Sequence, residues 1–112
     1  AVAIGTAHGI YQKEPVLDLG RIPFLQQAAQ VPLVLHGASG LSDSVLRSAV
    51  ARGMAKVNFA TELRQAFTAG VKEVLTAQPE VFDPKKYLAA GRKKVCLTAE
   101  KKMRVCGASG QR

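Results

Sequence analysis

VPLVLHGASG, residues 31–40, is the stretch that decides the fold. An apolar run typical of a buried β-strand carries His36 to its C-terminal end, and a loop of small residues follows at once. Such a strand end directs an imidazole and several backbone N–H groups to one point, which suits a metal ion, a phosphate group or both. AVAIGTAHG, residues 1–9, repeats this pattern with His8 and Gly9. A lone histidine in this position is usually a satisfied polar residue, but the repeat favours a ligand role.

The rest of the chain alternates expected strands and helices. Strands are expected at residues 1–5, 31–36 and 56–59, and loops at 6–20 and 37–42. Helices are expected at 21–30, from about 43 to Arg52 and at 61–77, with a basic terminal helix after Pro84. Ser42 or Asp43 caps the second helix, and Gly53 ends it. This β-α order predicts a parallel sheet with right-handed crossovers, whose functional residues gather at the carboxyl ends of the strands.

Charge is distributed unevenly along the sequence. Residues 1–84 hold seven Lys/Arg and seven Asp/Glu, whereas residues 85–112 hold nine Lys/Arg and only Glu100, so the tail supplies the net charge of +8. A basic tail could attract nucleic acid or an anionic surface. Apolar residues recur through it at helical spacing, which favours a solvated helix face, and no nucleic-acid motif is present; these residues are Leu88, Val95, Ala99, Met103 and Cys106. We therefore expect no nucleic-acid partner.

Two further features bound the class of protein. No segment approaches the roughly 18 consecutive apolar residues of a membrane span, so we expect no membrane partner. Cys96 and Cys106 lie ten residues apart on one expected helix, about 15 Å along its axis, which is too far for a disulfide. Neither has the spacing of a metal ligand, so we expect reduced thiols in a cytoplasmic protein.

Three motifs carry a family resemblance. AVAIGTAHGIY (1–11), VPLVLHGASGLS (31–42) and KVNFATELRQAF (56–67), with DPKKYL and the final VCGASG, resemble the C-terminal part of class II, zinc-dependent ketose-bisphosphate aldolases. Within that family the chain is most similar to the tagatose-bisphosphate branch. Fructose-bisphosphate members usually carry an acidic residue at the position of Ala60 and often differ at Ala38.

The resemblance implies an α/β fold, the C-terminal portion of a (β/α)₈ TIM barrel. Residues 1–112 would supply its last three β/α units and a C-terminal helix, as part of a single aldolase domain whose N-terminal half is absent. That half would carry a third histidine ligand and the catalytic Asp, so no catalytic residue is expected here. His8 and His36 are the implied zinc ligands. The implied substrate-binding residues are Gly9, Gly37, Ala38, Ser39, Asn58, Phe59, Ala60 and Thr61. An alternative for Asn58 or Thr61 is a simple helix-capping role.

The implied activity is zinc-dependent, reversible aldol cleavage of a ketose 1,6-bisphosphate to dihydroxyacetone phosphate and glyceraldehyde 3-phosphate. D-tagatose 1,6-bisphosphate is the favoured substrate, and fructose-bisphosphate aldolase is the alternative. The resemblance implies one Zn²⁺ per site, and it allows a monovalent cation, a homo-oligomer and an accessory aldolase subunit. Two other hypotheses remain open: a truncated, non-catalytic fragment that binds phosphate, and an anion- or partner-binding module built on the basic helix.

Overall fold

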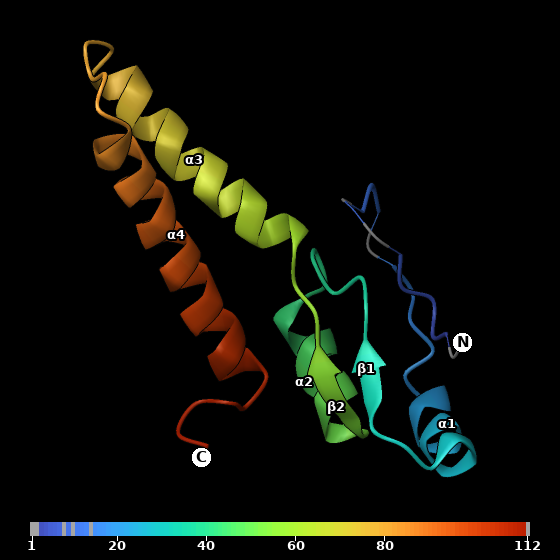
Figure 1. Cartoon of the computed structure of the whole chain (residues 1–112). Helices are drawn as coiled ribbons and strands as arrows, with labels where there is room; N and C mark the ends of the chain where they lie inside the picture. Colours follow the sequence, from blue (N-terminus) through green and yellow to red (C-terminus); the bar gives the residue numbers. More distant parts are fainter. Residues whose placement is uncertain (1–2, 8, 10, 14, 112) are drawn as a thin grey trace.

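A short parallel sheet, two neighbouring helices and a long helical hairpin make up the computed structural model, which describes residues 3–7, 9, 11–13 and 15–111. The elements in chain order are α1 (Arg21–Ala29), β1 (Leu33–Leu35), α2 (Asp43–Ala51), β2 (Met54–Val57), α3 (Thr61–Ala77) and α4 (Pro84–Val105). The strands pair in parallel, and α2 forms the crossover between them. The α3–α4 hairpin runs away from the sheet, so the molecule measures 57 × 35 × 22 Å (Figure 1).

The strands are shorter than expected or displaced along the sequence. β1 begins at Leu33 rather than residue 31, because Pro32 has no N–H to donate to a ladder. β2 begins at Met54, two residues before the expected start, and ends before Asn58. The Asn58 N–H still donates to the Leu35 carbonyl at 3.0 Å, so the backbone pairing reaches the end of both strands.

The expected strand at residues 1–5 is wrong in its described part. Ala3, Ile4 and Gly5 form no strand. The Ile4 carbonyl accepts the N–H of Asp18 at 3.0 Å instead of pairing with β1. The Ile4 side chain is nevertheless buried in the core, as an apolar residue of a buried strand would be. Only the predicted backbone pairing of this residue is wrong.

The observed helix boundaries agree closely with those predicted from the sequence. Helices expected at 21–30, 43–52 and 61–77 are confirmed to within one residue, and the Ser42 hydroxyl caps α2 by accepting the Val45 N–H at 3.4 Å. Gly53, with φ +113°, ends α2 and turns the chain into β2. No helix in the described part of the chain is long and apolar enough to cross a membrane.

The two faces of the sheet differ. One face is apolar and packs against the helices; the buried core is Ile4, Ile22, Leu33, Leu35, Ala38, Leu41, Leu46, Ala49, Met54 and Val105. On the other face, Val34 and its register partner Lys56 are exposed. Because side chains alternate along a strand, His36 and Asn58 lie on this second face, beyond the two exposed residues.

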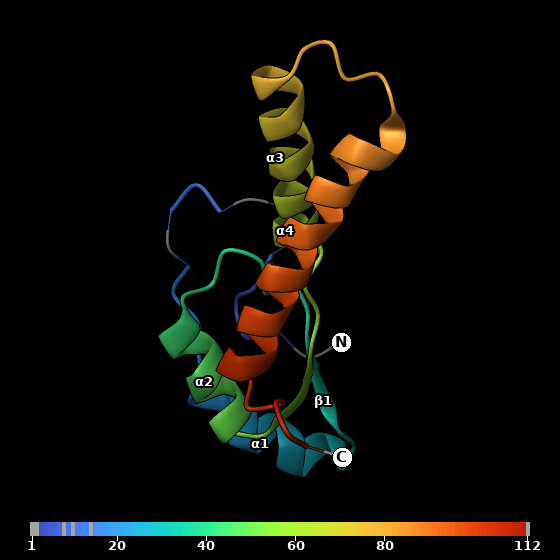
Figure 2. The same ribbon diagram turned by 90° about the vertical axis from the view of Figure 1, so that its left-hand side faces the viewer.

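The two helices of the hairpin, α3 and α4, cross each other (Figure 2), and a glycine of each lies where their backbones meet. A Cβ atom at Gly70 would lie 2.6 Å from the Ala90 carbonyl oxygen, and one at Gly91 would lie 2.9 Å from the Phe67 ring. Real Cβ atoms do not approach so closely, so the backbones of α3 and α4 meet only because both positions lack side chains.

The inward face of α4 differs from the expected apolar stripe. Leu88 and Met103 are exposed, whereas Lys102 and Val105 are buried. The expectation that the basic residues form a solvated face is therefore wrong for Lys102, which finds carboxylates on α2 and α3. Cys96 is exposed and Cys106 partly buried, and both are free thiols, as expected.

Candidate functional site at the carboxyl ends of the strands

A cavity of about 200 Å³ lies where β1 and β2 end. Every residue that lines it belongs to the set implied by the sequence: Gly9, His36, Gly37, Ser39, Asn58, Ala60 and Thr61. Larger hollows of about 530 and 550 Å³ border α4, but neither contains His36 or Ser39. The loops after β1 and β2 thus converge on one small space.

Three residues of the implied set lie elsewhere or cannot be placed. Ala38 is fully buried beneath its loop, and Phe59 lines the 530 Å³ hollow beside α4. Both remain next to the cavity along the chain, so their backbones are available to it even though their side chains are not. His8 lies outside the described residues.

His36 is oriented by Asn58. The Asn58 Nδ2 atom lies 3.3 Å from Nδ1 and 3.2 Å from Nε2 of His36, so the amide group lies against the imidazole ring. The two side chains come from adjacent strands and the same face of the sheet. Which ring nitrogen accepts the amide N–H depends on the tautomer of His36.

Ser39 joins the two loops. Its hydroxyl oxygen accepts the N–H groups of Ala60 at 3.3 Å and Glu62 at 3.4 Å, and the residue is only 6% exposed. The first turn of α3 is therefore capped from the other loop, whereas the sequence pointed to Asn58 or Thr61 as the capping candidates. A hydroxyl has two acceptor lone pairs and one proton, so Ser39 still has its O–H to donate.

Gly37 is required by its conformation and surroundings. Its φ of +66° lies in the left-handed region, and a Cβ would collide with the Ala7 carbonyl. The Tyr11 hydroxyl lies 2.8 Å from the Gly37 carbonyl and 3.0 Å from the Ala7 carbonyl, and it accepts the Ala7 N–H at 2.9 Å. Tyr11 thus holds the loop that follows β1 against residue 7. Sequence reasoning missed it, because a tyrosine three residues after His8 follows no recognised spacing.

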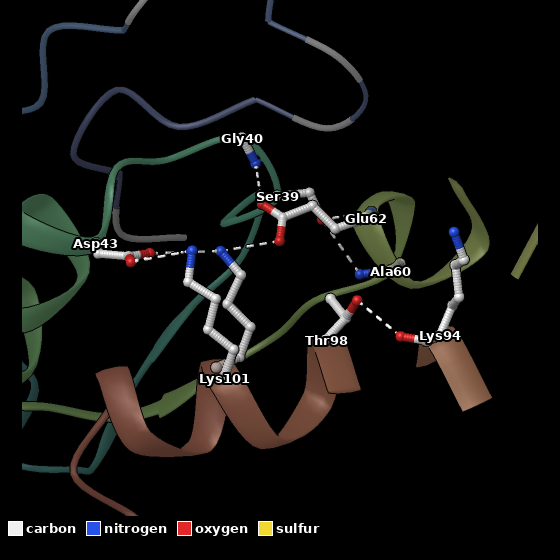
Figure 3. A network of polar contacts seen from close by, with 9 residues as sticks. Ser39, Gly40, Asp43, Ala60, Glu62, Lys94, Thr98 and Lys101 are labelled. Atoms are coloured by element: carbon white, nitrogen blue, oxygen red, sulfur yellow. Dashed lines mark hydrogen bonds and ion pairs between the residues drawn. The ribbon is translucent and has the colours of Figure 1, made fainter. Parts of the chain in front are cut away.

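A carboxylate and a lysine complete the support of the loops. Glu62 accepts the Gly40 N–H through Oε1 at 2.6 Å (Figure 3). It also pairs with the Lys102 ammonium through Oε2 at 2.8 Å. Lys102 also lies 4.0 Å from Asp43, which pairs with Lys101 at 3.2 Å. Sequence reasoning missed this network, since nothing separates Lys102 from the other basic residues of the tail until α4 is docked.

The metal-binding capacity of this part of the chain is incomplete. Among the described residues, no three His, Cys, Asp or Glu side chains gather closely enough to hold a metal ion. His36 offers the nitrogen donor that zinc prefers, and it lines the cavity. The donor chemistry of His36 fits one ligand of a zinc site, and any further ligands would have to come from outside the described residues.

Comparison with known proteins identifies the family of this chain. The family model for class II fructose-bisphosphate aldolase matches residues 1–111. The crystal structure of the YdjI aldolase from Escherichia coli K12 superimposes with a TM-score of 0.84 at 39% identity, over 97% of this chain and 39% of that one.

Two further solved structures agree. A putative fructose-1,6-bisphosphate aldolase from Coccidioides immitis matches with a TM-score of 0.78 at 25% identity, over 97% of this chain and 38% of that one. The fructose-bisphosphate aldolase of Campylobacter jejuni shares the fold, with a TM-score of 0.70 at 22% identity over 93% of this chain and 38% of that one. The chain spans about two fifths of these proteins and corresponds to part of their α/β barrel. It belongs to the class II fructose-bisphosphate aldolase family.

Proposed function

We propose that the complete protein carrying this chain catalyses zinc-dependent, reversible aldol cleavage of a ketose 1,6-bisphosphate, with D-tagatose 1,6-bisphosphate preferred. The products are dihydroxyacetone phosphate and glyceraldehyde 3-phosphate. The observation that supports this most directly is the cavity of about 200 Å³, which gathers one imidazole, one amide, two hydroxyls and the start of α3. Residues 1–112 would form the C-terminal part of a single barrel domain.

The substrate phosphate would bind between the two loops. The Ser39 O–H and the Thr61 hydroxyl are donors for its oxygens, and the positive end of the α3 dipole adds attraction for an anion. Gly9 and Gly37 allow the backbone to approach closely. Ala60 leaves space beside the phosphate, while Ala38 and Phe59 would contribute through their backbones.

The reacting carbons would lie nearer His36 and Asn58. His36 and His8 would hold the zinc ion together with a third histidine from the rest of the barrel. Zinc supplies Lewis-acid stabilisation of the negative charge that develops on the substrate oxygens. The Asn58 amide orients the substrate hydroxyls as well as the His36 ring. The proton-transferring Asp would also come from the rest of the barrel, so residues 1–112 alone would be inactive.

Substrate preference is tested by comparing kcat/KM for D-tagatose and D-fructose 1,6-bisphosphate. Dihydroxyacetone phosphate is measured through NADH oxidation by glycerol-3-phosphate dehydrogenase. We expect the tagatose ester to be cleaved with the higher kcat/KM, because Ala60 replaces the acidic residue usual in the fructose enzymes. A higher value for the fructose ester would assign the alternative substrate. Phosphate binding without cleavage of either ester would overturn the catalytic proposal.

The metal site is tested by His36→Ala in the complete protein. A zinc site that loses one histidine binds metal poorly, so we expect most of the zinc and nearly all of the cleavage activity to be lost. Arg47→Ala, at an exposed position on α2, is the matched control and should keep both. Full zinc occupancy of His36→Ala by atomic absorption would refute the ligand assignment.

Family resemblance supports three further components of the proposal. These are a homo-oligomer in the cytoplasm, an accessory aldolase subunit and a monovalent cation. Light scattering of the purified protein and activity measured with and without potassium would test the first and third. Co-expression with a candidate subunit, read as a gain in kcat, would test the second.

A further inference from the structure

Lys102 reaches from α4 to the back of the two loops without lining the cavity they enclose. Its ammonium lies 2.8 Å from Glu62 and 4.0 Å from Asp43, and its side chain is only 10% exposed. The same ammonium stands 5.2 Å from the centre of the Phe59 ring. A lysine is seldom buried this deeply unless its charge is paired, so the carboxylates explain its position.

Glu62 connects this lysine to both loops. Its carboxylate accepts the Gly40 N–H in the loop after β1, and its own N–H donates to Ser39. Glu62 is also an acidic residue in the first turn of α3, next to Thr61 of the cavity. A carboxylate there stabilises the helix, but an unpaired one would repel a phosphate dianion.

We propose that Lys102 is a positioning residue for phosphate. It offsets the charge of Glu62 and fixes the carboxylate so that Glu62 bonds Gly40 rather than repelling the ligand. This inference rests on the proposed phosphate role of the cavity. Lys102 touches neither the substrate nor the metal in this assignment, and it acts only through Glu62.

Lys101 provides a matched control on the same helix. It also pairs with a carboxylate, Asp43, at 3.2 Å, but its side chain is 61% exposed and it makes no contact with Glu62. Removal of either lysine lowers the net charge by one. Only removal of Lys102 leaves the Glu62 carboxylate without its cation.

The experiment measures the Kd of inorganic phosphate for the complete protein by calorimetry. In Lys102→Met we expect Kd to rise about five- to tenfold, the lower part of the usual range for energetic coupling between two sites. Lys101→Met should leave Kd within about twofold of the wild type, because surface charges are screened. The double variant Lys102→Met/Glu62→Gln removes both charges and should recover most of the affinity.

Glu62→Gln alone gives a reading that does not depend on the stability of Lys102→Met. Glutamine keeps the oxygen that accepts the Gly40 N–H and leaves the buried lysine charge in place. We therefore expect this variant to bind phosphate more tightly than the wild type. Weaker binding would overturn the charge role.

Other outcomes are equally decisive. Unchanged affinity in Lys102→Met would refute the inference, and so would a double variant as weak as Lys102→Met, since Lys102 would then only dock α4. A wild type that binds no phosphate would overturn both the inference and the phosphate site. If the wild type cleaves no ketose bisphosphate but the phosphate series behaves as expected, the proposed reaction fails and the role of Lys102 stands.

Discussion

Replacement of Ser39 by alanine removes one hydroxyl that has two roles. Its oxygen accepts the N–H groups of Ala60 and Glu62, and its proton is available to a bound phosphate. Ser39 itself is only 6% exposed, so alanine removes the acceptor of both N–H groups at a buried position. The same substitution should therefore lower stability in the absence of ligand and weaken phosphate binding.

The two effects have different sizes. The bonds to Ser39 are long, at 3.3 and 3.4 Å, so we expect a stability loss near the middle of the range for a lost helix cap, about 1 kcal/mol. A lost bond to a charged phosphate is worth about 1.5–3 kcal/mol, which raises Kd roughly ten- to a hundredfold. Urea unfolding of the complete protein measures the first quantity, and phosphate calorimetry measures the second.

Ser44→Ala is the control for this substitution. The Ser44 hydroxyl is exposed and contacts only Ser42 among the described hydrogen bonds, so neither stability nor phosphate affinity should fall. Lower stability of Ser39→Ala with wild-type phosphate affinity would reduce Ser39 to a helix cap. Wild-type values of both would refute the geometry of the two loops.

Three further predictions concern the helical hairpin. Gly70→Ala should lower the free energy of unfolding by about 1–2 kcal/mol, because overpacking against the α4 backbone outweighs the gain of about 1 kcal/mol in helix propensity. A variant that is more stable than the wild type in urea would contradict the close crossing of α3 and α4. The hydrogen bond and charge of Lys94 lower the pKa of Glu73, so the contribution of this pair to stability is present at neutral pH and disappears as pH falls through that lowered pKa. Glu73→Gln should therefore lower the melting temperature at about pH 7 but not at about pH 2. Equal decreases in melting temperature at both pH values would refute the pair. Burial raises the pKa of the Cys106 thiol, so in a Cys96→Ser background its alkylation by iodoacetamide should rise with pH at a higher midpoint than that of free cysteine measured in parallel; a midpoint at or below free cysteine would contradict the burial.

Most of the helices could be predicted from local sequence signals. Helix boundaries were predictable because they depend on nearby residues, such as Ser42 at the start of α2 and Gly53 after its end. Strand boundaries were less so, since a strand exists only where a partner accepts its hydrogen bonds. Ile4 illustrates the difference: its apolar side chain is in the core, but its carbonyl is taken by Asp18.

The residues of the candidate site also fall into those that the local sequence predicts and those that depend on tertiary structure. Residues that follow the strands directly were predictable from the motifs, and the cavity brings together His36, Ser39 and Thr61. The supporting residues were not, because Tyr11 and Lys102 reach the loops only after distant segments have docked. Their sequence neighbours give no indication of a role, and pairing partners such as Glu62 are determined by tertiary structure alone.

If the cavity binds phosphate as proposed, stability and ligand binding are coupled through the first turn of α3. Ser39 takes the N–H groups of Ala60 and Glu62, so this turn is ordered before any phosphate arrives, and phosphate need not displace those bonds. Glu62 in turn holds Gly40, and Lys102 holds Glu62. A preformed turn spares the ligand the entropy of ordering two loops, which would otherwise be subtracted from its affinity. Removal of Lys102 should therefore reduce phosphate affinity without changing a single group that contacts the ligand.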